Sequence, residues 1–390
     1  LLFFVAFKTA LRSPLSLGLL VLAVTAGVTF QIPNAANLEG YTQELLRQGL
    51  ARATGHVLLV GSTSEPLIKV RAMSARLQAL PYVRGVTPRL LHAGVLYRQE
   101  RYQATRVVGL DAKAEDAAIG FCRRVAQGRC MRRGTAEAML GATLAELLGA
   151  RVGDRLRLVA PHQDLGEIRF LKRPLKVVAL MENGGNFSED KDLFVPRETL
   201  SGWLDKRDEA TLISLQVDDR ARAKRYARAI SDELPNIKVL PWDEANAFVA
   251  NAIAGNRAIF AISMAMVIFA VGIPVLALLT IHVLGERKQI ATLAALGFGR
   301  GALFTIYLTR AALVGVVGVG LGIAAGLGLC SHFGGHPIFD YHGFVVRPAL
   351  SMEIVAVPAL TIFVVTLVAG LAPAIKASRG NASLLLRDQS

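Results

Sequence analysis

The residues best suited to metal binding lie close together near the end of the chain. His332, His336, Asp340 and His342 offer the imidazole and carboxylate ligands that zinc and copper accept. The same stretch is rich in aromatic rings and lies between two long apolar segments, which is typical of a loop at the headgroup level of a bilayer. We expect such an interfacial loop and assign no metal ligand, with a metal site as the alternative.

The sequence lacks the common catalytic patterns. It has no Gly-x-x-x-x-Gly-Lys-[Ser/Thr] phosphate loop, so the chain by itself does not hydrolyse ATP in the P-loop manner. The patterns His-Glu-x-x-His, Gly-x-Ser-x-Gly and Cys-x-x-Cys are also missing. We therefore predict a protein that is not an enzyme, with no catalytic residue and no cofactor of its own.

The cysteines are few. Cys122 and Cys130 lie in a loop rich in Gly and Arg. In an oxidising compartment they can form a disulfide that closes a small loop, or they can remain two free thiols. The third cysteine, Cys330, ends an apolar segment and is most simply a small apolar filler.

Four apolar segments are long enough to cross a bilayer, because its hydrocarbon core requires about 20 apolar residues in a helix. Helical and strand patterns alternate in the polar region between the first two segments. The predicted fold is an α-helical membrane protein with four transmembrane helices and a large α+β extracytoplasmic domain between helices 1 and 2. The first segment exceeds the hydrophobic core of a signal peptide, so we interpret it as a retained helix. The predicted boundaries are a cytoplasmic interfacial elbow at 1–14, helix 1 at 15–31, the α+β domain at 32–255, helix 2 at 259–281, a cytoplasmic loop at 282–302, helix 3 at 303–330, a short outer loop at 331–353, helix 4 at 354–375 and a cytoplasmic tail at 376–390.

The distribution of charge predicts the orientation in the membrane. The formal net charge is +14, but most charged residues lie in the α+β domain, where the two signs are nearly balanced. That domain shows no basic and aromatic platform, so we exclude nucleic acid as a partner. Outside the α+β domain, the short outer loop carries only Arg347. Eight basic residues fall on the other side of the membrane in a four-helix arrangement, which predicts that this side, with both termini, is cytoplasmic. These basic residues are Lys8, Arg12, Arg287, Lys288, Arg300, Lys376, Arg379 and Arg387.

The loop between helices 2 and 3 has the pattern of a short amphipathic helix. It opens with Glu286, Arg287 and Lys288, and an apolar stripe follows. A soluble partner protein can bind a short helix of this kind and, by displacing it, move the two membrane helices to which it is connected. The residues of this candidate site are Glu286, Arg287, Lys288, Ile290, Leu293, Leu296 and Gly297.

Helix 3 has two further features. Gly315, Gly318, Gly322 and Gly326 leave one face almost without side chains, so another helix can approach closely. The partner is either a second chain in a dimeric transmembrane core or a neighbouring helix of the same chain. Arg310 is a charge well inside the span, and we expect its side chain to snorkel to the cytoplasmic surface.

The chain resembles the permeases of the ABC-transporter superfamily that contains MacB, FtsX and the lipoprotein-releasing LolC and LolE proteins. The resemblance covers nearly the whole length and is most specific at 286–297, which is similar to the coupling segment of the family. Further similarity lies at 141–154 and 372–377, and 37–46 resembles the LolC/LolE branch in particular. The segment 161–174 occupies the place of the hook by which one Lol permease recruits its carrier, although a plain β-hairpin fits equally well.

The resemblance implies a permease of the bacterial inner membrane. A dimer of ABC ATPase subunits would bind ATP and Mg, a second permease, identical or paralogous, would complete the core, and a periplasmic carrier or adaptor would accept a lipid or lipoprotein substrate. Acyl chains would enter between helices 1 and 2. Candidate walls of that cavity are Val28, Phe30, Phe260, Met264 and Val267.

Two alternatives keep the same architecture. A MacB-like permease would export toxic small molecules or peptides, and an FtsX-like member would transmit the nucleotide state to a cell-wall hydrolase. A membrane-anchored sensor is disfavoured, because the cytoplasmic segments are too short to hold a signalling domain.

Overall fold

The computed structural model describes residues 14–50, 55–61, 65–164, 167–183, 188–296, 298–341 and 344–378. The chain forms two compact units. The helical unit comprises Leu1–Gln43, Ala254–Ile338 and Val346–Ser390, and the α+β unit comprises Glu44–Ile253 and Phe339–Val345. The predicted elbow, apart from Pro14, and most of the predicted tail lie outside the described residues.

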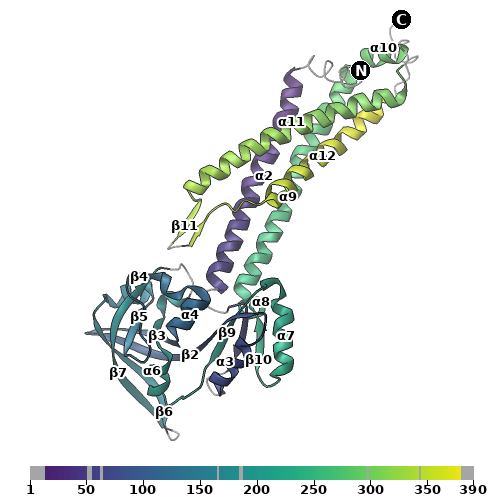
Figure 1. Ribbon diagram of the computed structural model, residues 1–390. Coiled ribbons are helices and arrows are strands. Elements are labelled where there is room, and N and C mark those ends of the chain that lie inside the picture. Colours follow the sequence, from purple (N-terminus) through teal and green to yellow (C-terminus); the bar gives the residue numbers. More distant parts are fainter. Residues whose placement is uncertain are drawn as a thin grey trace. The chain divides into compact units, whose positions relative to one another are not determined.

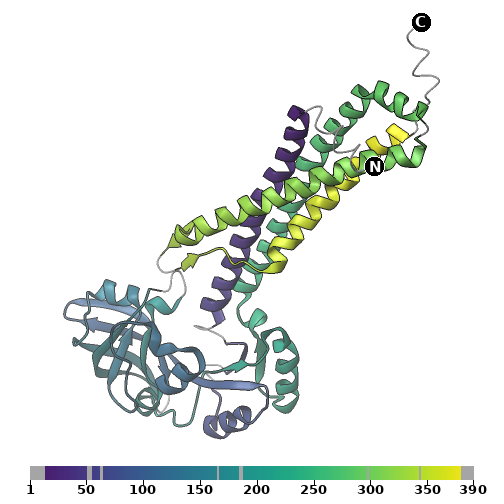
Figure 2. The same ribbon diagram turned by 45° about the horizontal axis from the view of Figure 1, so that its top comes forward.

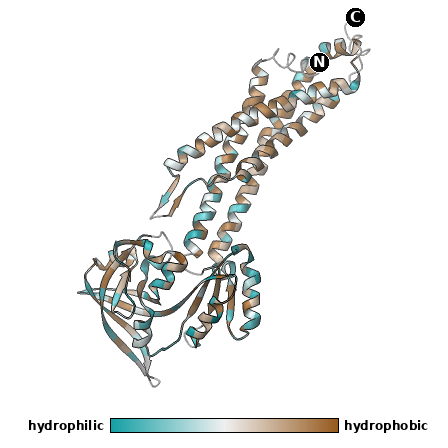
Figure 3. Ribbon diagram, viewed as in Figure 1, coloured by the Kyte–Doolittle hydropathy of each residue, from teal (hydrophilic) through white to brown (hydrophobic). Residues whose placement is uncertain are grey.

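Four helices are long and apolar enough to cross a membrane: α2 (Pro14–Gly49), α9 (Ala247–Gly285), α11 (Arg300–Gly335) and α12 (Met352–Ser378). Their hydrophobic character is visible in Figure 3. Each predicted span lies inside one of them, and α2 continues well beyond its predicted end. The expectation of four spanning helices with an α+β domain inserted between the first and second is confirmed.

The helical unit is held together by close contacts at glycines. A Cβ atom added to Gly322 would lie 2.6 Å from Cβ of Val28, and one added to Gly315 would lie 2.8 Å from the ring of Phe363 on α12. Gly318 and Gly326 make the same kind of approach to α2. Helices α11 and α12 run side by side in both views (Figures 1 and 2). Of the two partners left open for the glycine face, the structure shows helices of the same chain.

One lobe of the α+β unit is a small antiparallel sheet packed against helices. Its strands lie in the order β10 (Lys238–Pro241), β1 (Val57–Val60), β9 (Leu212–Val217) and the first part of β2 (Val83–Arg98), all antiparallel. Helices α3 (Val70–Gln78) and α7 (Ala223–Glu233) contribute Val70, Leu77 and Ile230 to its core. Helix α8 (Trp242–Ala245) follows β10.

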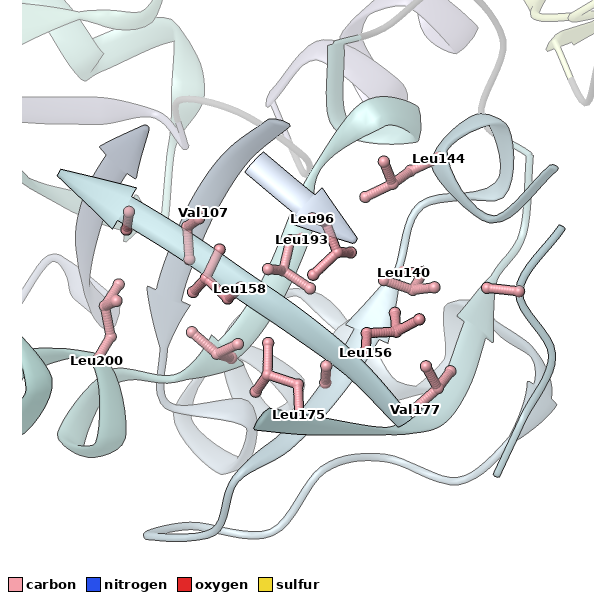
Figure 4. Packing of buried hydrophobic residues seen from close by; sticks show 14 of the residues in the cluster. Leu96, Val107, Leu140, Leu144, Leu156, Leu158, Leu175, Val177, Leu193 and Leu200 are labelled. Atoms are coloured by element: carbon pink, nitrogen blue, oxygen red, sulfur yellow. The ribbon is translucent and has the colours of Figure 1, made fainter. Parts of the chain in front are cut away.

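The other lobe is a closed ring of six strands. Strand β2 pairs with β3 (Arg101–Leu110), and the ring continues through β8 (Leu193–Pro196), β5 (Glu137–Leu140), β7 (Glu167–Met181) and β6 (Arg155–Asp164), which pairs back with β2. The short β4 (Val125–Gly128) extends the edge of β7. Alternate residues point inward, and Figure 4 shows Leu96, Leu156 and Leu175 packed in the interior. Three short helices accompany the strands: α4 (Ala112–Ile119), α5 (Ala142–Leu148) and α6 (Arg197–Trp203).

The segment 161–174 is part of a regular β-hairpin. Pro161 pairs with Phe170 in the ladder between β6 and β7, and the pairing continues to Asp164 and Glu167. The segment therefore has the geometry of a hairpin, and its role in recruiting a carrier stays a prediction. Elsewhere, β11 (Phe339–Tyr341) and β12 (Phe344–Val346) form a separate two-stranded ladder.

Buried ion pairs join strand β2 to helix α4 and link two 3-10 turns of the same lobe. Nε of Arg89 lies 2.6 Å from Oε1 of Glu115, and a guanidinium nitrogen of Arg124 lies 2.7 Å from a carboxylate oxygen of Glu189. Because each charge has a partner, burial does not leave it uncompensated. Asp192 pairs with Arg106 at 2.5 Å, yet burial outweighs this contact and raises the pKa of Asp192 to about 6.

Candidate functional site

The candidate coupling segment is a distinct helix at the end of the helical unit where α12 also ends (Figure 1). Helix α10 (Arg287–Ala295) follows α9 after the single residue Glu286. A carboxylate at this position is favourable, since the N-terminal end of a helix carries a partial positive charge. The predicted end of the segment, Gly297, lies outside the described residues.

One side of α10 is packed against its neighbours. Ile290 is 3% exposed and belongs to an apolar cluster with Val283, Leu303 and Ala374, against which Leu293 also packs. These residues come from α9, α11 and α12, so α10 is held by three membrane helices. A force on α10 must therefore displace side chains of those helices.

The other side of α10 is open. Leu296 is 71% exposed, and Arg287 is also exposed. Lys288 lies in α10, but its side chain is outside the described part of the chain. Arg287 at the start of α10 and Leu296 directly after its last residue are therefore accessible to a partner protein.

Arg310 does not snorkel, and this corrects the sequence prediction. Its side chain is 2% exposed, and its Nη1 donates to Glu286 at 2.9 Å from Oε1 and 3.1 Å from Oε2. The hydroxyl of Tyr307 donates to Oε2 of the same carboxylate at 3.0 Å. The turn after α9 brings a negative charge to Arg310, and a paired charge needs no path to the surface. Glu286 is the only acidic residue between Glu244 and Asp340 in the sequence, and this was the signal for the pair.

The five residues predicted as cavity walls differ in burial. Val28 and Val267 are buried in the packed interior of the helical unit, whereas Phe30 is 61% exposed. Met264 is partly buried. Only Phe260 of this set borders a cavity of about 240 Å³ between α2, α9 and α12. Helices that are apolar on every side give no periodicity from which an inward face can be read.

The structure also shows the state of the three cysteines and the arrangement of the histidines considered as metal ligands. A disulfide joins Cys122 to Cys130 in the α+β unit, and Cys330 is buried as a free thiol. The rings of His332 and His336 stack with their centroids 4.9 Å apart. His342 lies outside the described residues, and no group of three or more possible metal ligands occurs among the residues that are described.

These features define a multi-pass membrane protein with an inserted α+β domain and a short helix, α10, between its second and third spanning helices. Residues 15–233 match the family model of the MacB-like periplasmic core domain, and residues 261–382 match that of the FtsX-like permease C-terminal domain. The chain therefore belongs to the MacB/FtsX family of ABC-transporter permeases.

Curated relatives fall in two groups. The lipoprotein-releasing system transmembrane protein LolE of Haemophilus influenzae is 23% identical over 315 residues, which is 78% of this chain and 75% of that protein. The macrolide export ATP-binding/permease protein MacB of Neisseria meningitidis is 25% identical over 190 residues, 45% of this chain and 30% of MacB. The chain thus spans less than a third of the length of that relative.

Two solved structures resemble part of the chain. The periplasmic region of MacB from Actinobacillus actinomycetemcomitans covers 52% of this chain and 95% of its own, with 14% identity and a TM-score of 0.38. The extracellular domain of the noncanonic ABC-type transporter YknZ covers 47% of this chain and 97% of its own, with 14% identity and a TM-score of 0.34.

Proposed function

We propose that this chain is the permease subunit of an inner-membrane ABC transporter that releases lipoproteins to a periplasmic carrier, driven by an ATPase on another polypeptide. The ATPase pair, in which ATP and Mg bind, would close in an ATP-driven step and push α10. A second permease, identical or paralogous, would complete the membrane core. Both termini would be cytoplasmic and the α+β unit periplasmic.

The observation that carries the proposal is the two-sided environment of α10. Ile290 is packed on α9, α11 and α12, whereas Arg287 at the start of α10 and Leu296 directly after its end are exposed. A helix that is fixed to the membrane helices on one side and accessible on the other can pass a push from a soluble partner into the membrane.

Two further observations support a lipidated substrate. The similarity to LolE extends over more of the chain than the similarity to MacB. The cavity between α2, α9 and α12 combines apolar walls, among them Phe260 and Val357, with the charged Arg257 and Glu353. Acyl chains are stabilised in a bilayer by about 0.8 kcal/mol per methylene, so their extraction requires an energy source.

Macrolide or peptide export is the second candidate function, because MacB also matches the chain. Reconstitution separates the two. Proteoliposomes that contain the full chain, its second permease and the ATPase are loaded with a triacylated lipoprotein, and the release to a soluble carrier is measured with and without ATP. ATP-dependent release supports the proposal. ATP-dependent macrolide movement without lipoprotein release would contradict it and favour the second candidate.

The coupling role has its own test. Charge reversal in the double variant Arg287→Glu/Lys288→Glu should abolish stimulation of the ATPase by the permease. Lys376→Glu is the matched control, because Lys376 is an exposed cation at the end of α12, outside α10. Normal ATPase stimulation in the double variant would argue against α10 as the coupling element.

A further inference from the structure

We infer that Glu286, Arg310 and Tyr307 form a polar latch through which α11 is pushed directly by α10. This inference rests on the proposed function and adds to it the route by which motion spreads. Glu286 is the only residue between α9 and α10. Its carboxylate accepts hydrogen bonds from Nη1 of Arg310 at 2.9 Å and from the hydroxyl of Tyr307 at 3.0 Å, two donors about one turn apart on α11. The corner between α9 and α10 is thus fastened to α11 by side chains.

Burial makes the latch hard to open. The side chain of Arg310 is 2% exposed and that of Glu286 is 13% exposed. Tyr307 packs in an apolar cluster with Val283 and Leu303, and Nε2 of His282 lies 3.9 Å from Oε1 of Glu286. Separation of the pair would leave a charge without a counter-charge in apolar surroundings, which is strongly unfavourable. Displacement of Glu286 should therefore draw Arg310, and with it α11, in the same direction.

Helix α11 can pass this motion on, because it is interlocked with α2. The hydroxyl of Thr25 donates to the carbonyl of Gly318 at 3.1 Å. Gly322 and Gly326 approach α2 so closely that a Cβ atom on either would lie 3.2 Å or less from a side-chain carbon of α2. A push on α10 thus has two routes, one along the chain into α9 and one through the latch into α11 and α2. Arg310 and Tyr307 are positioning residues, since they act through Glu286.

The test measures coupling in the reconstituted full complex. Arg310→Met should leave ATPase binding and ATP hydrolysis in place and lower the lipoprotein released per ATP hydrolysed by about tenfold, the loss expected for one strong charge-assisted contact. The double variant Glu286→Gln/Arg310→Gln, which replaces the ion pair by two amides that can still bond, should recover most of this loss. Arg300→Met is the matched control, because Arg300 is an exposed cation at the start of the same helix and lies outside the cavity.

Release per ATP equal to wild type in Arg310→Met would overturn the latch. If Arg310→Met does not fold, Tyr307→Phe carries the test, because it deletes one hydroxyl only. It should lower release per ATP by about threefold, and an unchanged ratio would overturn the latch. A purely structural role would lower the melting temperature and the amount of complex, but not the release per ATP of the complex that remains.

A distance measurement tests the latch without a substrate. Spin labels at Leu296→Cys and Leu321→Cys, both exposed positions, are introduced in a Cys330→Ala background. With a non-hydrolysable ATP analogue, the distance between the labels should stay constant when Arg310 is present and change in Arg310→Met. A change in both proteins would overturn the latch. If Arg287→Glu/Lys288→Glu abolishes ATPase stimulation while Arg310→Met keeps the wild-type release per ATP, the latch alone is overturned. If the wild-type chain binds no ATPase, the proposed function is overturned.

Discussion

The contact between α11 and α2 predicts that two glycines separated by one residue respond in opposite ways to the same substitution. In Gly322→Ala the new methyl carbon would lie 2.6 Å from Cβ of Val28 and 3.0 Å from the carbonyl oxygen of Thr25, so the helices must move apart. Overpacking of this kind costs about 1–3 kcal/mol. Alanine also favours the helix over glycine by about 1 kcal/mol, which offsets part of that cost. The matched control is Gly320→Ala, because no atom lies within 4 Å of a Cβ at that position.

The free energy of unfolding of the full chain, measured by titration with SDS in mixed micelles, checks this prediction. Gly320→Ala should be as stable as the wild type or more stable, by up to about 1 kcal/mol. Gly322→Ala should lie about 1–3 kcal/mol below Gly320→Ala, because only the contact with α2 differs between the two variants. Equal stability of the two alanine variants would refute the close packing of α11 on α2.

The α+β unit gives three further predictions, each measured as thermal stability of the full chain. Burial raises the pKa of Asp192 to about 6, so the folded state holds a proton that the unfolded state loses near pH 4, and stability should fall by up to about 3 kcal/mol as pH rises from 4 to 6. This decrease should vanish in Asp192→Asn, and an unchanged pH profile in that variant would contradict the assignment. Replacement of Cys122 and Cys130 by serine should cost about 2–3 kcal/mol, as expected for a small closed loop, and equal stability would speak against the disulfide. Arg89→Met should cost about 3–5 kcal/mol because it leaves Glu115 buried without its partner, and a loss below 1 kcal/mol would refute that reasoning.

The membrane architecture could be read from the sequence, because the cost of placing polar groups in hydrocarbon leaves long apolar runs that are visible by eye. The amphipathic stripe of α10 could be read only in part, because Ile290 lies on the buried side as its spacing suggested, whereas Leu296 of the same stripe is 71% exposed. The extent of α2 was underestimated, since its last turns are polar and carry no hydropathy signal up to Gly49.

Long-range pairing could not be predicted. Strand β6 closes the ring on β2 through pairs such as Val95 with Val159, and nothing local in either strand specifies that partner. The inward faces of the membrane helices were equally hidden, because every face is apolar, which is why Val28 and Phe30 were placed together although one is buried and the other exposed. Arg310 was misplaced because its partner lies 24 residues away, beyond a turn whose geometry the sequence does not give.

The measurement that tests the central claim most directly is a photo-crosslink from α10 to the ATPase. A photoreactive amino acid is placed at position 296, where Leu296 is 71% exposed. As a control, the same photoreactive amino acid is placed at position 329, where Leu329 is 40% exposed near the C-terminal end of α11. If α10 receives the push of an ATPase, position 296 should crosslink to the ATPase in a nucleotide-dependent manner and position 329 should not. Absence of any crosslink to an ATPase from position 296 in the assembled complex, or an equal yield from both positions, would contradict it.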